Sequence, residues 1–167
     1  MNREATTLRD SPAAVEYQVR DARITDVERI SALVPARAEA RPAAPGILAA
    51  SDLLRQLVYL PNAVVLVADA RRQVVGATVL ALRPSVLEGG MVGSVDLLAV
   101  DPAYEAAGVT DSLIAEGLRS ARNKGCVAVE ATRPDDPAEQ ARWEGHGFAE
   151  AGPRIVCELA PAGVARS

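Results

Sequence analysis

Hydrophobic and polar positions follow two different periods along the chain, and the changes of period divide it into elements. Runs rich in β-branched residues predict strands at 17–24, 63–70, 74–82, 91–100 and 126–131. Apolar residues spaced three and four apart predict helices at 24–34, 50–60, 109–123 and 136–146. A final hairpin is expected over 147–160.

Local signals suggest where these helices begin and end. Thr25 and Glu28 stand at capping-box spacing, which satisfies two free donors at a helix start. Ser51 and Pro61 bracket the second helix, and Gly125 is a suitable C-cap for the third. The order is β-α-α-β-β-β-α-β-α-β-β, which predicts an α/β fold with one mixed central sheet and helices on both faces.

The 167 residues suit one domain with a sizeable core. The polar, unpatterned start predicts a mobile tail over 1–16, the domain extends over 17–160, and a short tail follows over 161–167. Three prolines within 35–46 indicate a long loop or a broken helix.

Composition narrows the class of protein. The formal net charge is −4 and the chain has no basic run, which argues against nonspecific nucleic-acid binding. No apolar run is long enough for a membrane helix, and the N-terminus lacks a signal-peptide segment, so a cytoplasmic protein is expected. Cys126 and Cys157 are read as buried thiols, and with one histidine they make no convincing metal site.

One stretch carries a specific resemblance. The strand ending LAVDP is followed by an aromatic residue, a glycine turn and an amphipathic helix, and this combination resembles the centre of the GNAT N-acetyltransferase superfamily. The runs VRDARITDVERISALV, VVGATVLAL and ARWEGHGF are similar to other parts of it, so the resemblance extends over about 19–159. It implies transfer of an acetyl group from acetyl-CoA, bound where two central strands splay apart, to an amine of a small molecule or a protein.

The resemblance also implies which residues hold the cofactor. Backbone groups of the strand would pair with the pantetheine amides, and the Leu98 N–H would polarise the thioester carbonyl. The pyrophosphate would rest on backbone N–H groups at the start of the third helix. The implied cofactor-binding residues are Leu98, Ala99, Val100, Ala106, Ala107, Gly108, Val109 and Thr110. The side chains of Leu98 and Val100 are otherwise ordinary buried strand residues.

The glycine turn departs from the family pattern. Where the family has Arg/Gln-x-x-Gly-x-Gly/Ala, this chain reads EAAGVT from Glu105 to Thr110. A carboxylate about 4 Å from a phosphate charge costs about 1 kcal/mol in water and about 4 kcal/mol near a protein surface. Thr110 adds a branched side chain, although its hydroxyl is also a donor. The sequence therefore predicts a weakened acetyl-CoA site.

A second departure affects the chemistry. Trp143 occupies the position of a family tyrosine whose hydroxyl is implied to protonate the leaving thiolate. An indole N–H is a donor but no acid at neutral pH. Trp143 is thus expected to shape the acyl pocket or stack on the cofactor, or else to anchor its helix on the sheet.

Two strand carboxylates are candidate bases for the amine. Asp96 lies in an apolar strand, and alternation places it on the face of Leu98; partial burial there would raise its pKa. The alternative is an exposed or ion-paired Asp96. Glu130, on the neighbouring strand, is the second candidate and is more typical of an ion pair. Weaker candidates are Glu88, Tyr104 and His146.

A function of another class fits the same residues. Glu105 and Trp143 depart from the family at positions tied to cofactor binding and turnover, which is compatible with a GNAT fold that has lost catalysis and acts as a binding or regulatory module. The segment 35–54, which corresponds to the acceptor side, does not identify a substrate. A homodimer is also left open.

Overall fold

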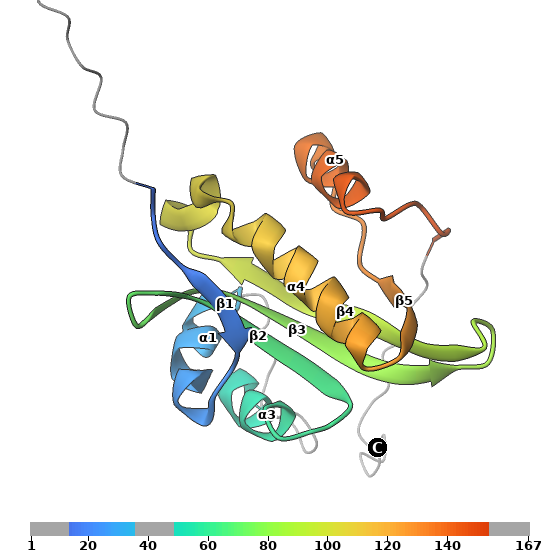
Figure 1. The fold of residues 1–167 in the computed structure, drawn as a ribbon, viewed down its shortest axis with the longest axis horizontal. Coiled ribbons are helices and arrows are strands. Elements are labelled where there is room, and N and C mark those ends of the chain that lie inside the picture. Colours follow the sequence, from blue (N-terminus) through green and yellow to red (C-terminus); the bar gives the residue numbers. More distant parts are fainter. Residues whose placement is uncertain (1–13, 36–48, 154–167) are drawn as a thin grey trace, which may run out of the picture.

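The computed structural model describes residues 14–35 and 49–153, which form a single twisted sheet flanked by helices (Figure 1). The five strands lie in the order in which they follow along the chain. The strands are β1 (Gln18–Asp21), β2 (Ala63–Ala70), β3 (Gln73–Ser85), β4 (Gly90–Val100) and β5 (Cys126–Glu130). Neighbours are antiparallel except β4 and β5, which are parallel.

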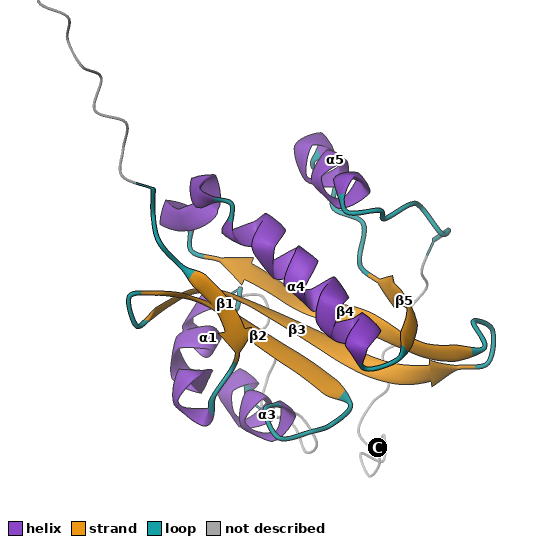
Figure 2. Cartoon of the chain, in the orientation of Figure 1, coloured by secondary structure: helices purple, strands orange, loops and turns teal. Residues whose placement is uncertain are grey.

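Helices cover both faces of this sheet (Figure 2). The helical segments are η1 (Ile24–Asp26), α1 (Val27–Leu33), α3 (Ala50–Leu57), η2 (Pro102–Ala107), α4 (Val109–Asn123) and α5 (Pro137–Gly145). Helices α1 and α3 pack on one face and α4 on the other. This confirms the predicted α/β class and the mixed sheet.

Two apolar clusters form the core, one on each face. Val64 and Leu66 of β2 pack with Leu113 of α4, whereas Val65 and Val67 pack with the α1 and α3 side. Because β2 is buried on both faces, its sequence is a nearly continuous apolar run and does not alternate with polar residues.

The predicted order of elements is correct as far as the described residues extend, but the capping residues predicted for the first two helices are wrong. Asp26, and not Thr25 with Glu28, accepts the N–H at the first turn, from Arg23 at 2.7 Å. Ser51 lies inside α3, which begins after Ala49 and ends at Leu57. Gly125 does follow α4 in a left-handed conformation, with φ of 84°.

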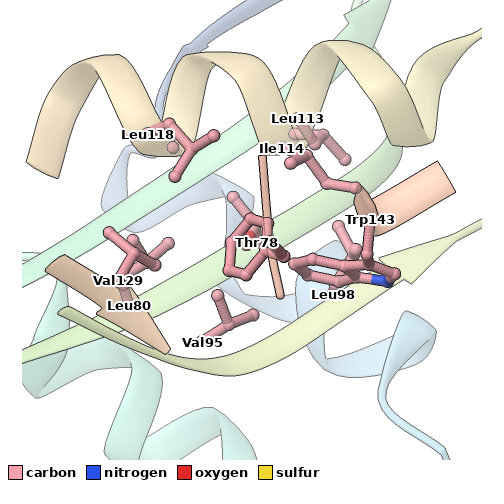
Figure 3. Close-up of a pocket in the computed structure, with 11 residues that line it drawn as sticks. Thr78, Leu80, Val95, Leu98, Leu113, Ile114, Leu118, Val129 and Trp143 are labelled. Carbon is pink, nitrogen blue, oxygen red and sulfur yellow. The ribbon is translucent and has the colours of Figure 1, made fainter. Parts of the chain in front are cut away.

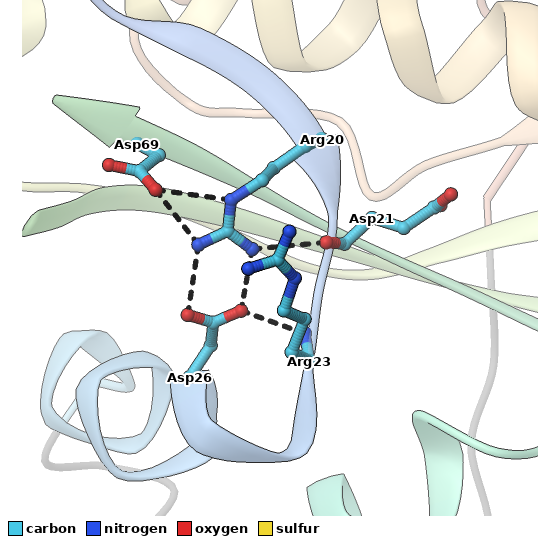
Figure 4. Close-up of polar contacts among 5 residues, drawn as sticks. All are labelled: Arg20, Asp21, Arg23, Asp26 and Asp69. Atoms are coloured by element: carbon cyan, nitrogen blue, oxygen red, sulfur yellow. Dashed lines mark hydrogen bonds and ion pairs between the residues drawn. The ribbon is translucent and has the colours of Figure 1, made fainter. Parts of the chain in front are cut away.

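Asp26 has a second partner that explains its position (Figure 4). The Arg20 guanidinium of β1 donates to Asp26 at 2.7 Å and to Asp69 of β2 at 2.9 Å. The three side chains are 10–19% exposed. Hydrogen bonding from Arg20 holds the pKa of Asp26 below its usual range. This ion cluster ties β1, η1 and β2 together.

Several predictions lie wholly or partly outside the described residues. The N-terminal tail falls there except for its last residues, as do most of the loop at 35–46, Cys157, and the final hairpin from residue 154 on. Residues 148–153 carry no strand. Cys126 is half-buried and burial raises the pKa of its thiol. In the described ranges no helix is long and apolar enough to span a bilayer, and no group of side chains could hold a metal ion.

Candidate functional site

The sheet opens between β4 and β5. The two strands pair only where Met91–Ser94 lies beside Cys126–Glu130, and β4 then continues to Val100. Beyond Ser94 no described strand pairs with this outer edge of β4. Backbone groups of β4 that point outward from this stretch are therefore free to bind a ligand.

A β-bulge lies at the point where the strands separate. Val79 of β3 pairs with Leu97, and the next residue pairs with Val95, so Asp96 is the extra residue. Val95 and Leu98 both pack on the α4 side, whereas Leu97 packs on the α1 and α3 side. The bulge thus changes the alternation on which the placement of Asp96 was predicted.

Asp96 is exposed. The prediction that it shares a partly buried face with Leu98 is wrong, because the bulge interrupts the two-residue period between them. Its alternative, an exposed Asp96, is what the structure has. As an exposed carboxylate beside the opening of the sheet, it retains access to solvent and to any molecule bound there.

The direction of the β4 backbone follows from the register. The Asp101 N–H donates to the Val75 carbonyl at 2.8 Å, which makes these two residues a hydrogen-bonded pair. Such pairs alternate along an antiparallel ladder. The Leu98 and Val100 positions are therefore of the other kind, and their N–H and C=O groups point away from β3, toward the opening left by β5.

An apolar pocket lies over this part of β4 (Figure 3). It is a small depression of about 10 Å³ that opens to solvent and lies between the sheet, α4 and α5. Figure 3 shows the Trp143 indole beside Leu98, with Leu113 and Ile114 of α4 above the sheet. The Trp143 and Phe148 rings meet edge to face, with centroids 4.8 Å apart. Trp143 therefore lines the pocket and packs against Phe148, while contact with an acyl group or with the cofactor stays a prediction.

Beyond the end of β4, the chain leads through η2 to the first turn of α4. Gly108 precedes this helix with φ of 81°, a conformation that glycine adopts without strain. Ala106 and Ala107 lie inside η2, whose i→i−3 bonds use backbone N–H groups, and the Gly108 N–H donates weakly to Glu105 at 3.3 Å. The free donors of this turn are thus the first N–H groups of α4, from Val109 onward.

Residues from other elements surround this turn. The Tyr17 hydroxyl is 2.7 Å from the Ser112 hydroxyl and would be 3.7 Å from a β-carbon at Gly108. Asp111, in the first turn of α4, is 2.9 Å from His146 and 3.6 Å from Arg142 of α5. Sequence reasoning missed Tyr17 and Arg142, because only the folded sheet brings them to this helix end.

The remaining candidates have ordinary structural surroundings. Glu130 forms an ion pair with Arg83 at 3.0 Å and also bonds the Ser94 hydroxyl, as expected of an ion-paired strand carboxylate. Tyr104 is half-buried and packs on the core beneath α4. Glu105 is exposed on η2, and Thr110 is buried in α4. Glu88 is exposed in the β3–β4 loop.

Together these features define a class of protein. It is an α/β protein in which two parallel strands, β4 and β5, separate beside helix α4, which begins directly after Gly108. Residues 31–148, more than half of the chain, match the model of the acetyltransferase (GNAT) family, so the chain belongs to that family. It is a GNAT-family acetyltransferase, and such proteins typically use acetyl-CoA to acetylate amines. A search of curated protein sequences gave no match.

Solved structures show the same fold at low sequence identity. An acetyltransferase of Trypanosoma brucei is 23% identical, with a TM-score of 0.66 over 86% of this chain and all of that chain. A transcriptional regulator of Bacillus halodurans C-125 is 17% identical, with a TM-score of 0.72 over 86% and 100%. A ribosomal-protein-alanine N-acetyltransferase of Brucella melitensis biovar Abortus 2308 is 18% identical, with a TM-score of 0.65 over 87% and 100%.

Proposed function

We propose that this protein transfers an acetyl group from acetyl-CoA to an amine of a small molecule or a protein. The observation that carries the proposal is the unpaired outer edge of β4, which borders an apolar pocket and ends at a glycine-led helix. An extended chain with amide groups can add to such an edge as a strand does. The pantetheine arm of acetyl-CoA has this form, and its pyrophosphate suits the free N–H groups of α4.

Different groups of the protein would contact the amides, the apolar parts and the thioester of acetyl-CoA. Leu98 and Val100 present backbone donors and acceptors to the pantetheine amides, while Leu113 and Trp143 cover its apolar parts. The Leu98 N–H lies at the middle of the open edge, where it would polarise the thioester carbonyl. The amine nitrogen then attacks that carbon, the C–S bond breaks, and CoA leaves as the thiolate.

The reaction needs a base for the proton of the amine and an acid for the CoA thiolate, and few of the described side chains near the opening can serve. We assign Asp96 as the group that takes the proton of the attacking amine, directly or through water, because it is exposed beside the opening of the sheet. Glu130 is the less suitable base, since Arg83 and Ser94 already bind it. Trp143 cannot protonate the thiolate, so water supplies that proton.

The weakened turn is part of this proposal. Glu105 is exposed, and its carboxylate repels the pyrophosphate to an extent that depends on its side-chain direction. Arg142 of α5 and His146, which directly follows α5, both contact Asp111 beside the same turn. We infer that the site keeps acetyl-CoA, with lower affinity than a turn that has arginine in place of Glu105.

Turnover of an amine panel tests the function. The release of the CoA thiol is followed with acetyl-CoA and small amines, amino acids and peptides, for the wild type and for Asp96→Asn. We expect acetylation of at least one acceptor and a rate for Asp96→Asn lower by about 100-fold, the usual contribution of a general base. An unchanged rate and pH profile in Asp96→Asn would contradict the assignment of the base.

A catalytically silent binding module is the second candidate. Trp143 favours it, because this residue replaces the tyrosine that the family resemblance implies as the acid. One protein of similar fold, from Bacillus halodurans C-125, is described as a transcriptional regulator. Binding of acetyl-CoA without turnover of any amine, combined with turnover in Trp143→Tyr, would favour this second function.

A further inference from the structure

Thr78 of β3 is a buried polar residue in the apolar wall of the pocket. It is 2% exposed, and its hydroxyl donates to the Leu97 carbonyl of β4 at 2.9 Å. Its partner across the ladder is Leu98, and Figure 3 shows both residues in the pocket lining. A valine would fill the same space without a polar group, so the hydroxyl has a cost that its hydrogen bond has to offset.

The hydrogen bond fixes the peptide unit that joins Leu97 and Leu98. A trans peptide is planar, and its C=O and N–H groups point in opposite directions. Holding the Leu97 carbonyl toward β3 therefore points the Leu98 N–H away from β3, into the opening beside β4. Rotation of this peptide would carry both groups out of line together.

This peptide lies directly beside an irregularity in the sheet. The bulge at Asp96 interrupts the β3–β4 ladder directly before it. On its other side β5 no longer pairs with β4, since that pairing ends at Ser94. The register implies that the Val79 N–H also donates to the Leu97 carbonyl, and the buried Thr78 hydroxyl adds a second, side-chain donor to that carbonyl next to the bulge.

We propose that Thr78 is a positioning residue that sets the direction of the Leu98 N–H. The inference rests on the proposed function, in which this N–H polarises the thioester. A donor aimed at the oxygen that becomes negative stabilises the transition state more than the bound substrate. Thr78 is therefore expected to affect the rate constant of acetyl transfer more than the affinity for acetyl-CoA.

The first test measures the N–H direction in the free protein. Residual dipolar couplings of backbone amides are compared for the wild type, Thr78→Val, Thr78→Ser and the control Val67→Ala, which removes buried volume on the α1 and α3 face of the sheet, opposite the pocket. We expect Thr78→Val to change the Leu98 coupling while Thr78→Ser and Val67→Ala retain it. Thr78→Ala replaces the valine variant if the latter does not fold. A Leu98 coupling unchanged in the folded valine or alanine variant would overturn the proposal.

The second test uses the same variants in turnover and in binding of acetyl-CoA. Thr78→Val should lower kcat about tenfold, a part of the effect of losing an oxyanion donor, with KM for acetyl-CoA within about twofold. Thr78→Ser should restore kcat, because it keeps the hydroxyl. An equal decrease of kcat in Thr78→Val and Val67→Ala would mean that Thr78 contributes only to packing. If the wild type binds no acetyl-CoA, the proposed function fails, and the dipolar couplings alone decide whether Thr78 aims the Leu98 N–H.

Discussion

At the scale of single residues, the Arg20 cluster shows how a buried charge is tolerated. Arg20 is bound by the carboxylates of Asp26 and Asp69, and Asp26 also accepts the Arg23 N–H. Buried charges are retained when they are paired and hydrogen-bonded in this way. Removing Arg20 leaves both carboxylates without their guanidinium partner, whereas removing Asp26 leaves Arg20 with Asp69 as its remaining carboxylate partner.

Replacement of Asp26 by Asn should destabilise the protein by about 2 kcal/mol at pH 7, because it removes a charge-assisted pair from a buried position. The folded-state pKa of Asp26 is depressed, so its contribution is present above the unfolded pKa of about 3.9 and is lost as the pH falls below that value. Urea unfolding at pH 7 and near pH 3 measures this difference. Asp52→Asn, in an exposed pair with Arg55, should change stability by less than about 0.5 kcal/mol. Equal effects of Asp26→Asn at both pH values would refute this pH dependence.

Glu105 is the residue at which binding of the cofactor should be easiest to improve. Glu105→Arg removes a repulsion and adds an attraction near the phosphates, so affinity for acetyl-CoA should rise about tenfold at low salt and fall more steeply with salt. Calorimetry at two ionic strengths checks this. Glu28→Arg makes the same charge change on α1, across the sheet from the turn, and should have little effect. An unchanged affinity in Glu105→Arg would mean that this carboxylate points away from the phosphates.

The β2–β3 turn is strained, because Arg71 and Arg72 both have positive φ, of 53° and 68°. Turns of this kind favour Asn-Gly. The double variant Arg71→Asn, Arg72→Gly should therefore stabilise the protein by about 1 kcal/mol, measured by urea unfolding. The reverse order, Arg71→Gly with Arg72→Asn, serves as a control for loss of charge. A decrease in stability would indicate that the two arginines have contacts that offset the strain.

At the scale of elements, α5 is held against the start of α4 by few polar contacts among the described residues. Asp111 joins them through His146 and Arg142, and the Trp143–Phe148 pair packs beneath α5. These ion pairs are partly exposed, so they contribute little to global stability. Their effect should be local, on the position of the helix that carries Trp143 over the pocket.

Asp111→Asn should loosen this contact without unfolding the protein. We expect faster hydrogen exchange in the amides of α5 and a change of less than about 0.5 kcal/mol in global stability. Glu116→Gln removes an ion pair with Arg119 on the same helix, away from α5, and is the matched control. Unchanged exchange in α5 would mean that the aromatic pair alone holds this helix.

The elements also show what the sequence could and could not predict. The amphipathic pattern of α4 and the continuous apolar run of β2 predicted their positions well, because each depends on burial of its own residues. The bulge at Asp96 has no signal in the pattern VDLL, because it depends on how β3 and β4 pair. Alternation therefore predicted a partly buried Asp96, whereas the structure has it exposed. The role proposed for the Leu98 backbone does not depend on side-chain alternation. Tyr17 and Arg142 could not be found, since tertiary contacts alone bring them to α4.

At the scale of the whole molecule, residues of β4 and α4 line the pocket, and together with the first turn of α4 they make up the surface proposed for the cofactor. A sheet that opens in this way exposes backbone groups, which are costly unless water or a ligand satisfies them. In the proposed complex acetyl-CoA occupies that surface and its phosphates rest at Gly108. Such binding depends on the backbone of the turn more than on any side chain.

Two glycines allow this binding site to be tested directly. Gly108 and Gly125 lie at opposite ends of α4, have φ of 81° and 84°, and have room for a side chain. Tryptophan at either position introduces the same backbone strain, but only Gly108→Trp covers the free N–H groups of the turn. The decisive measurement is a calorimetric titration of acetyl-CoA into the wild type and these two folded variants. Micromolar binding to the wild type and Gly125→Trp, with none to Gly108→Trp, is the predicted result; equal affinity in all three would contradict the site.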